Sequence, residues 1–159
     1  MTIDARFEDG GEGPLALRAE SADDLSVIAA LVQDAVLPTS EIAWDAKARR
    51  LSCLLNRFRW EDKATAEAEG RPYERVQSLL VLSDVTGVQS MGVDRKDRDL
   101  VLSVLDIAFD PADDGAGRLI LTVAGDGAIA ASVECLSVDL RDVTRPYRAV
   151  SGKAPHHPD

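Results

Sequence analysis

The strongest fold signal in the chain is the stretch 119–133, which reads Leu119-Ile-Leu-Thr-Val-Ala-Gly-Asp-Gly-Ala-Ile-Ala-Ala-Ser-Val133. Apolar residues recur at every second position on both sides of Gly125-Asp126-Gly127, which is typical of two strands joined by a tight turn. Strands joined in this way run antiparallel. The stretch therefore predicts a β-hairpin, and the rest of the chain can be compared with it.

Further stretches with strand character lie on both sides of the hairpin, at residues 42–44, 51–60, 76–85, 85–93, 100–109 and 136–140. Two of them, 76–85 and 100–109, are almost continuously apolar, which predicts central strands buried on both faces. The apolar alternation slips in phase between Leu55 and Phe58, which predicts a β-bulge around Asn56. Short polar turns separate most of these stretches, so an antiparallel sheet is expected.

One helix is predicted near the start of the chain, over residues 22–36. Apolar residues recur there at helical spacing, from Leu25 to Val36. Ser21 followed by Asp24 resembles a capping box, and Pro38 is expected to end the helix. Residues 61–73 predict an exposed loop or a short helical excursion.

The predicted fold class is α+β, with a predominantly antiparallel, curved sheet or partly closed barrel and one N-terminal amphipathic helix. A PH-like arrangement is one form that such a sheet takes. A single helix cannot supply the crossovers that a parallel sheet needs. We expect one domain over residues 15–149, because 1–14 and 150–159 lack apolar periodicity and are expected to be flexible termini.

The composition limits the partners and the cellular compartment that we expect for the protein. A net charge of −10 over 159 residues opposes phosphate backbones, so general nucleic-acid binding is not expected. The start of the chain lacks a secretory signal, and no apolar run approaches the roughly 20 residues of a membrane helix. Cys53 and Cys135 are interpreted as core residues in a reducing compartment. We therefore expect a cytoplasmic monomer or weak homodimer without a membrane association.

Three segments together resemble a known family: Gln33-Asp34-Ala35, Leu54-Leu-Asn-Arg-Phe-Arg-Trp-Glu61 and Asp139-Leu-Arg-Asp-Val-Thr-Arg-Pro146. They are similar to an uncharacterised family of small alphaproteobacterial proteins, domain of unknown function 2948. The resemblance runs from about Leu15 to Tyr147. It implies no activity, cofactor or site residue.

Several kinds of catalytic site are excluded by the residues present. His156 and His157 are the only histidines, and they lie in the C-terminal tail, so His-based triads and zinc sites are not expected. No glycine-rich phosphate loop precedes a helix, and Ser90 lacks the flanking glycine of a nucleophile elbow. We expect no cofactor and no metal, and the sequence favours a non-catalytic role over an enzymatic one.

The remaining constellation is a basic island within this acidic chain: residues 46–63 carry six basic and two acidic side chains. If Phe58 and Trp60 point into the core, Arg57 and Arg59 share the opposite face and could hold an anionic ligand by forked hydrogen bonds. Arg50 and Arg145 are candidates to extend this site. The alternative is structural, with the same arginines paired to the surplus carboxylates of this chain.

Two function classes follow. The first is a non-catalytic binding or adaptor module for a protein or an anionic ligand, which requires a groove or apolar patch beside the arginines. The second is a small enzyme that uses carboxylate acid/base chemistry in a cleft, which requires a deep pocket with perturbed acids. The sequence leaves both open.

Overall fold

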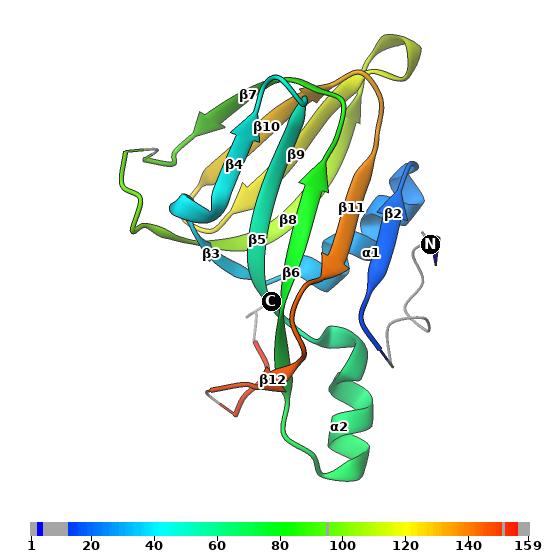
Figure 1. Cartoon of the computed structure of the whole chain (residues 1–159), viewed down its shortest axis with the longest axis vertical. Coiled ribbons are helices and arrows are strands. Elements are labelled where there is room, and N and C mark those ends of the chain that lie inside the picture. The colour runs from blue at the N-terminus through cyan, green and yellow to red at the C-terminus, as the bar shows by residue number, and fades with distance from the viewer. Residues whose placement is uncertain (1–2, 5–12, 95, 151, 156–159) are drawn as a thin grey trace.

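The computed structural model describes residues 3–4, 13–94, 96–150 and 152–155, which form a mostly antiparallel sheet of 12 strands with two α-helices (Figure 1). The helices are α1 (Ala22–Val32) and α2 (Lys63–Glu69), and the 3-10 turns are η2 (Thr39–Glu41), η3 (Trp60–Asp62) and η4 (Asp113–Gly115). The strands are β1 (Ile3–Asp4), β2 (Ala16–Ala19), β3 (Val36–Pro38), β4 (Ile42–Asp45), β5 (Arg50–Phe58), β6 (Glu74–Leu82), β7 (Val85–Met91), β8 (Val101–Pro111), β9 (Gly117–Val123), β10 (Gly127–Val133), β11 (Val138–Asp142) and β12 (Tyr147–Arg148).

The strand order is β1-β2-β11-β6-β5-β3-β8-β9-β10-β7, with β4 also paired to β5 and β12 to β6. Among the described strands only β1 and β2 pair in parallel. The short strand β3 joins the two halves, because Val36 pairs with Asn56 of β5 on one side and with Ser103 of β8 on the other. The sheet is therefore curved and mainly antiparallel, as predicted, but it does not close into a barrel.

The hairpin predicted at 119–133 is confirmed. β9 and β10 pair antiparallel from Gly117↔Val133 to Val123↔Gly127. Gly125 and Asp126 take the left-handed conformation in the connecting turn, with φ of 86° and 63°. Glycine adopts this conformation without strain, and aspartate tolerates it better than most residues.

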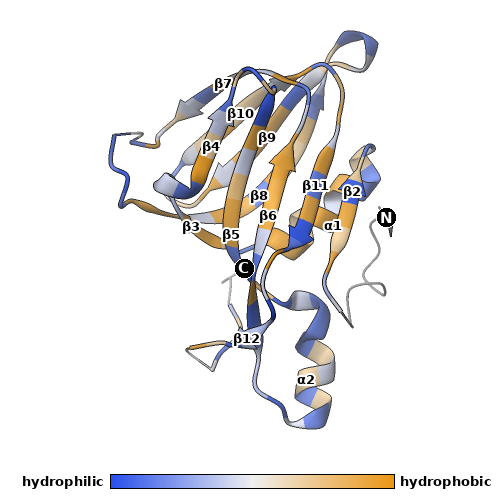
Figure 2. Ribbon diagram, viewed as in Figure 1, coloured by the Kyte–Doolittle hydropathy of each residue, from blue (hydrophilic) through white to orange (hydrophobic). Residues whose placement is uncertain are grey.

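The core lies between the inner face of the sheet and α1. Leu25, Ile28, Leu31 and Val32 of α1 are buried, and the helix packs mainly on β8, with further contacts to β2 and β5. The hydroxyl of Ser21 accepts a hydrogen bond from the backbone nitrogen of Asp24 at 3.2 Å. Figure 2 shows long apolar stretches on β5, β6 and β11, whose inward side chains complete this core.

The helix ends at Val32, four residues before the predicted end at Val36. Asp34 has φ of 64°, which reverses the chain, and its N–H donates to the carbonyl of Val104 at 2.8 Å. Pairing with β8 therefore ends the helix before Pro38 does. The apolar residue Val36 continues the helical pattern in sequence but belongs to β3.

The predicted β-bulge around Asn56 is wrong. β5 pairs with β6 in unbroken register from Leu51↔Leu82 to Phe58↔Arg75. The pattern slipped because Arg57 occupies an inward position in line with Leu51 and Leu55, where an apolar residue was expected. The register shifts of the described sheet lie elsewhere, between Ser132 and Val133 and between Val104 and Asp106.

The prediction that 76–85 and 100–109 are buried on both faces is also wrong. In β6 the residues Leu80 and Leu82 are buried inside, whereas Leu79 and Val81 are half-buried on the outer face. In β8 the side chains of Val101 and Leu105 are exposed. The outer face of β6 thus presents apolar side chains that no other described element covers completely.

The remaining predictions concern residues 61–73, the two cysteines and the two histidines. Residues 63–69 form the short helix α2, one of the two arrangements expected for 61–73. Cys53 is buried, but Cys135 is exposed and donates to the Asp84 carboxylate at 3.2 Å, so it is not the core residue that was expected. His156 and His157 lie outside the described residues. No helix among the described residues is long and apolar enough to cross a membrane.

Candidate functional site

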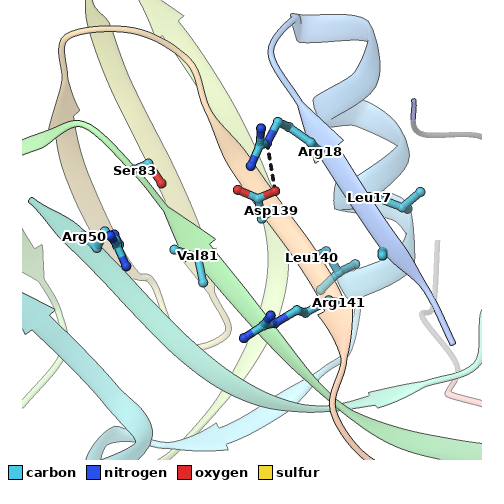
Figure 3. Close-up of a pocket in the computed structure, with 9 residues that line it drawn as sticks. Leu17, Arg18, Arg50, Val81, Ser83, Asp139, Leu140 and Arg141 are labelled. Atoms are coloured by element: carbon cyan, nitrogen blue, oxygen red, sulfur yellow. Dashed lines mark hydrogen bonds and ion pairs between the residues drawn. The ribbon is translucent and has the colours of Figure 1, made fainter. Parts of the chain in front are cut away.

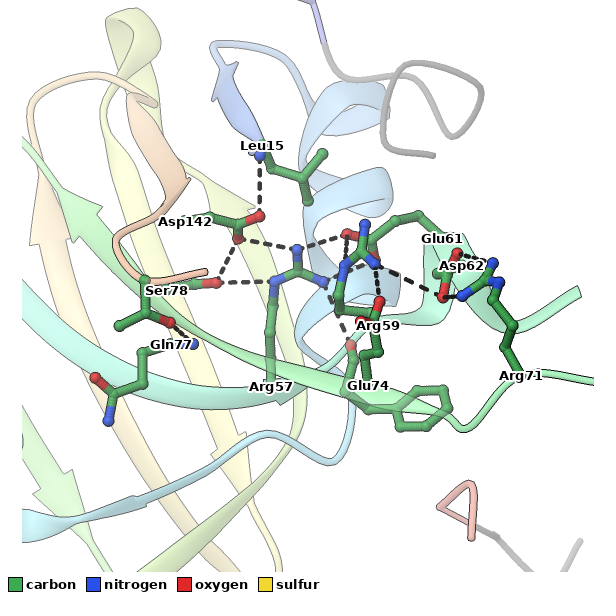
Figure 4. Close-up of polar contacts among 12 residues, drawn as sticks. Leu15, Arg57, Arg59, Glu61, Asp62, Arg71, Glu74, Gln77, Ser78 and Asp142 are labelled. Atoms are coloured by element: carbon green, nitrogen blue, oxygen red, sulfur yellow. Dashed lines mark hydrogen bonds and ion pairs between the residues drawn. The ribbon is translucent and has the colours of Figure 1, made fainter. Parts of the chain in front are cut away.

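Arg57, the centre of the predicted basic island, lies inside the protein with no solvent-exposed surface. Its guanidinium donates two hydrogen bonds to Glu61, at 2.9 and 2.7 Å, and one to Asp142 at 3.0 Å (Figure 4). Its Nε donates to the hydroxyl of Ser78 at 2.9 Å. Burial lowers the pKa of Arg57, but the hydrogen bonds and charges of Glu61 and Asp142 outweigh it and hold the pKa above its usual value.

Asp142 connects this arginine to the first strand of the domain. One carboxylate oxygen accepts from Arg57 and from the Ser78 hydroxyl, at 3.0 and 2.7 Å. The other accepts from the backbone nitrogen of Leu15 at 2.9 Å. Elements far apart in sequence, at the start of β2, in β5, in β6 and in β11, are therefore held together by one carboxylate.

Arg59 and Arg71 extend the cluster toward α2. Arg59 is paired with Glu74 and lies 3.6 Å from Asp62. Arg71 reaches the same Asp62 carboxylate at 3.1 Å. We call this group the arginine clasp; its members are Arg57, Arg59, Arg71, Glu61, Asp62, Glu74, Ser78 and Asp142.

The arginine clasp is poorly suited to hold an anionic ligand. Its three arginines face four carboxylates, so the cluster as a whole carries no excess of positive charge. An anion would have to displace Glu61 or Asp142 from a guanidinium to which they are already bound. The ligand-binding role of Arg57 and Arg59 stays a prediction, and the geometry favours the structural alternative.

The other two predicted site residues lie elsewhere. Arg50 stands at the opposite end of β5, about 23 Å along the strand from Arg57 at roughly 3.3 Å a residue. Arg145 is exposed in the loop between β11 and β12. The structure therefore does not bring the four predicted residues together.

Arg50 instead lines a groove of about 470 Å³ on the outer face of β2, β11, β6 and β5 (Figure 3). Antiparallel register decides which side chains meet there: Asp139 of β11 lies between Arg18 of β2 and Val81 of β6. Arg141 projects from the same face of β11, two residues along. We call this surface the arginine groove; its members are Arg18, Arg50, Arg141, Asp139, Val81 and Ser83.

The arginine groove carries an excess of positive charge. Arg18 is paired with Asp139 at 3.0 Å, and both side chains are partly exposed. Arg50 and Arg141 make no ion pair and no side-chain hydrogen bond with the described residues. Among the residues that line the groove, three arginines thus face one carboxylate, in a protein whose net charge is −10. Asp45 of β4 lies opposite Arg50 in register but forms no ion pair with it.

One family model matches residues 15–157. The chain belongs to that family, a protein of unknown function (DUF2948). No curated protein and no solved structure matches the chain. The DUF2948 match begins at Leu15, the residue that Asp142 holds, and it includes every member of the arginine clasp and of the arginine groove. The resemblance found in the sequence is thereby confirmed at the level of the family.

Sequence reasoning missed Arg18 and Arg141 in this DUF2948 domain. The sequence does contain a pattern that indicates their orientation. Each arginine alternates with apolar residues of its own strand: Leu17 and Ala19 flank Arg18, and Leu140 precedes Arg141. The alternation predicts that both point outward. It does not predict that β2, β11, β6 and β5 are neighbours. No group of three or more metal-ligating side chains is found among the residues that the structure describes.

Proposed function

We propose that this protein is a non-catalytic binding module that takes an acidic segment of a partner protein in the arginine groove. The observation that carries the proposal is that Arg50 and Arg141 line one groove and have no ionic partner among the described residues. Exposed arginines of this kind offer forked donors for carboxylates.

The spacing of the two arginines favours an extended partner over a small anion. Arg141 and Leu54 both pair with Leu79, so Arg141 lies level with Leu54 and two strands away from it. With Arg50 four residues farther along β5, the two arginine backbones are about 16 Å apart at roughly 4.8 Å between strands and 3.3 Å along them. An extended peptide with carboxylates at positions i and i+4 spans about 13 Å on one face, which the arginine side chains can reach.

The floor of the groove supports the same occupant. Val81 is half-buried between the arginines, so a bound segment would remove its apolar surface from water. The carboxylate of the groove, Asp139, is paired with Arg18. This arrangement supports a binding surface rather than the carboxylate-lined cleft that an acid/base enzyme requires.

An acidic polypeptide is the favoured partner, because the arginines of the groove offer local forked donors to two carboxylates. A nucleic acid carries a phosphate at every nucleotide, so the net charge of −10 opposes its binding much more strongly. A cytoplasmic setting, a monomeric or weakly dimeric state and a PH-like relation of the curved sheet stay predictions.

The test uses a dye-labelled heptapeptide with two glutamates at positions i and i+4 in a glycine-serine background, measured by fluorescence anisotropy at low salt. The wild-type protein should bind it, and added salt should weaken the complex. The double variant Arg50→Gln/Arg141→Gln should lose at least about tenfold in affinity, equivalent to about 1.4 kcal/mol. Its thermal unfolding should match the wild type, because both side chains are exposed and unpaired among the described residues.

The control is Arg118→Gln/Arg148→Gln, which removes the same charge from two exposed arginines of β9 and β12. It should retain the affinity. Equal losses in the two double variants would mean that removing any two positive charges weakens the peptide complex, wherever they lie. That result, or no binding by the wild type at low salt, would reject the arginine groove as the site.

A further inference from the structure

A second site lies where the curved sheet fails to close. The backbone nitrogen of Val85, at the start of β7, donates to the carbonyl of Arg49 at 2.9 Å, next to the turn between β4 and β5. Beyond this contact β7 pairs only with β10, and β4 pairs only with β5, among the described strands. The two strands therefore leave their facing edges unpaired among the described residues, and Figure 1 shows both in the upper part of the molecule.

The space between the two strands is a cavity of about 210 Å³. We call it the β4–β7 slot. Its floor is formed by Leu51 and Ile129, which are almost completely buried, and its walls by Ile42 of β4 and Val88 of β7, which are half-buried. Trp44 stands at the rim with 38 % of its surface exposed. This is an apolar cavity with an aromatic edge, which is the usual character of a small-molecule site.

One charged side chain completes the slot. Arg98 lines it and makes no ion pair or side-chain hydrogen bond with the part of the chain that the structure describes. The turn that carries Arg98 is fixed to the slot on both sides: the Thr39 hydroxyl donates to the Asp97 carbonyl at 2.6 Å, and the Thr39 nitrogen donates to Leu100 at 2.9 Å. The backbone of this turn is thus held beside the apolar cavity, and the exposed side chain of Arg98 lines the cavity from there.

We propose that the β4–β7 slot binds a small carboxylate with an apolar body, whose carboxylate pairs with Arg98 and whose body lies on Leu51 and Ile129. A cavity of 210 Å³ equals the volume of about seven water molecules at roughly 30 Å³ each, so the ligand has on the order of ten non-hydrogen atoms. The guanidinium of Arg98 favours a ligand with a negative charge, and the apolar walls favour a ligand with an apolar body. The site is separate from the arginine groove and does not depend on it.

Octanoate is a suitable probe, because it joins one carboxylate to an apolar chain and has the expected size. Trp44 provides the signal, since a ligand that covers its exposed face shifts its fluorescence to shorter wavelength. The second tryptophan, Trp60, is half-buried and its ring nitrogen already donates to the Gln33 carbonyl at 3.0 Å, so its emission should not change. Calorimetry with Trp44→Phe, which loses the signal but keeps an aromatic rim, should still detect the binding heat.

Five comparisons define the ligand class and the site. Octanoate should bind the wild type, and 1-octanol and acetate should each bind at least about tenfold more weakly, because one lacks the charge and the other the body. Arg98→Gln should lower the octanoate affinity about tenfold or more and leave that of octanol unchanged. Val88→Phe, which adds a ring inside the slot, should abolish binding of both, whereas Arg118→Gln, on an exposed site of β9, should change nothing.

Each contrary result overturns a defined part of the proposal. Equal affinity for octanol and octanoate, or an unchanged affinity in Arg98→Gln, would reject the carboxylate pairing. Octanoate binding that survives Val88→Phe would place the ligand outside the slot. No heat and no fluorescence change with octanoate at millimolar concentration would reject the site altogether, whatever the acidic peptide does in the arginine groove.

Discussion

At the residue scale, Arg57 is a charged side chain on the inward face of a strand. An isolated buried charge costs several kcal/mol, and such a residue persists only when it is paired and fully hydrogen-bonded. Glu61 supplies a forked contact, Asp142 a second negative charge and Ser78 a neutral acceptor. The condition set for the predicted site, that Phe58 points into the core opposite Arg57, is therefore not met. Arg57 lies on the inward face of β5, and Phe58 is buried on the other face, in edge-to-face contact with Trp60 and Tyr73.

Replacing Arg57 with Gln should destabilise the protein by about 3–5 kcal/mol, because the change leaves the carboxylates of Glu61 and Asp142 buried without their counter-charge. Chemical denaturation of the purified variant measures the loss. Arg141→Gln is the matched control, since it removes the same charge from the surface, and its free energy of unfolding should lie within about 0.5 kcal/mol of the wild type. Similar small effects in both variants would show that the arginine clasp does not stabilise the fold.

At the scale of single elements, β6 shows how one strand serves both the core and the surface. Its inward residues Leu80 and Leu82 belong to the core, as predicted, and its outward residues Leu79 and Val81 remain half-buried. A nearly continuous apolar run can therefore arise in a strand with one solvated face. The outward apolar side chains then become part of the surface that the arginine groove offers to a partner.

The same substitution at two neighbouring leucines of β6 tests which face of the strand is buried in the core. Leu80→Ala should cost about 2–5 kcal/mol, because it removes a fully buried side chain and leaves a cavity. Leu79→Ala should cost about 1 kcal/mol or less, because its side chain already contacts water in the folded protein. Urea unfolding of both variants provides the comparison. A larger cost at Leu79 than at Leu80 would reverse the assignment of the two faces.

At the scale of the whole molecule, hydrogen bonds join both predicted ends of the domain to the sheet. The backbone of Leu15 forms hydrogen bonds in both directions with Asp142, and the Ala149 nitrogen donates to the Tyr73 carbonyl at 2.8 Å. Outside these contacts, β1 adds a two-residue parallel pairing to β2. The predicted domain of 15–149 thus contains the buried core and the residues at either end that are hydrogen-bonded to it.

A chain of residues 15–149 should unfold within a few degrees of the full-length protein, because the removed residues contribute little buried apolar surface to the described structure. A chain that starts at residue 18 should unfold much earlier, since it also loses Leu15 and Leu17, both 3 % exposed. Differential scanning calorimetry distinguishes the two. A large loss of stability already in the 15–149 chain would show that β1 or the C-terminal residues support the fold.

The amino-acid sequence by itself determined the features that depend on neighbouring residues. The 119–133 hairpin follows from alternation and a glycine-rich turn, and α1 from helical spacing after Ser21. The core positions of Leu80, Leu82, Val104 and Leu121 follow from the same periodicity, because a side chain's face is set within its own strand. Such patterns act over a few residues, and they are visible without knowledge of the partners.

Only the tertiary structure decided which strands lie side by side, and with that both sites. The arginine groove needs Arg18, Arg141 and Arg50 on β2, β11 and β5, which lie within four consecutive strands of the sheet although they are far apart along the chain. The inward position of Arg57 follows from the alternation of β5, but its buried charge is neutralised by Asp142, 85 residues away. The alternation within one strand does not predict which other strand lies beside it, because strand order and register are set by the burial of the whole sheet. Charge along the chain therefore predicted a basic island, whereas folding divided it between a buried clasp and an open groove.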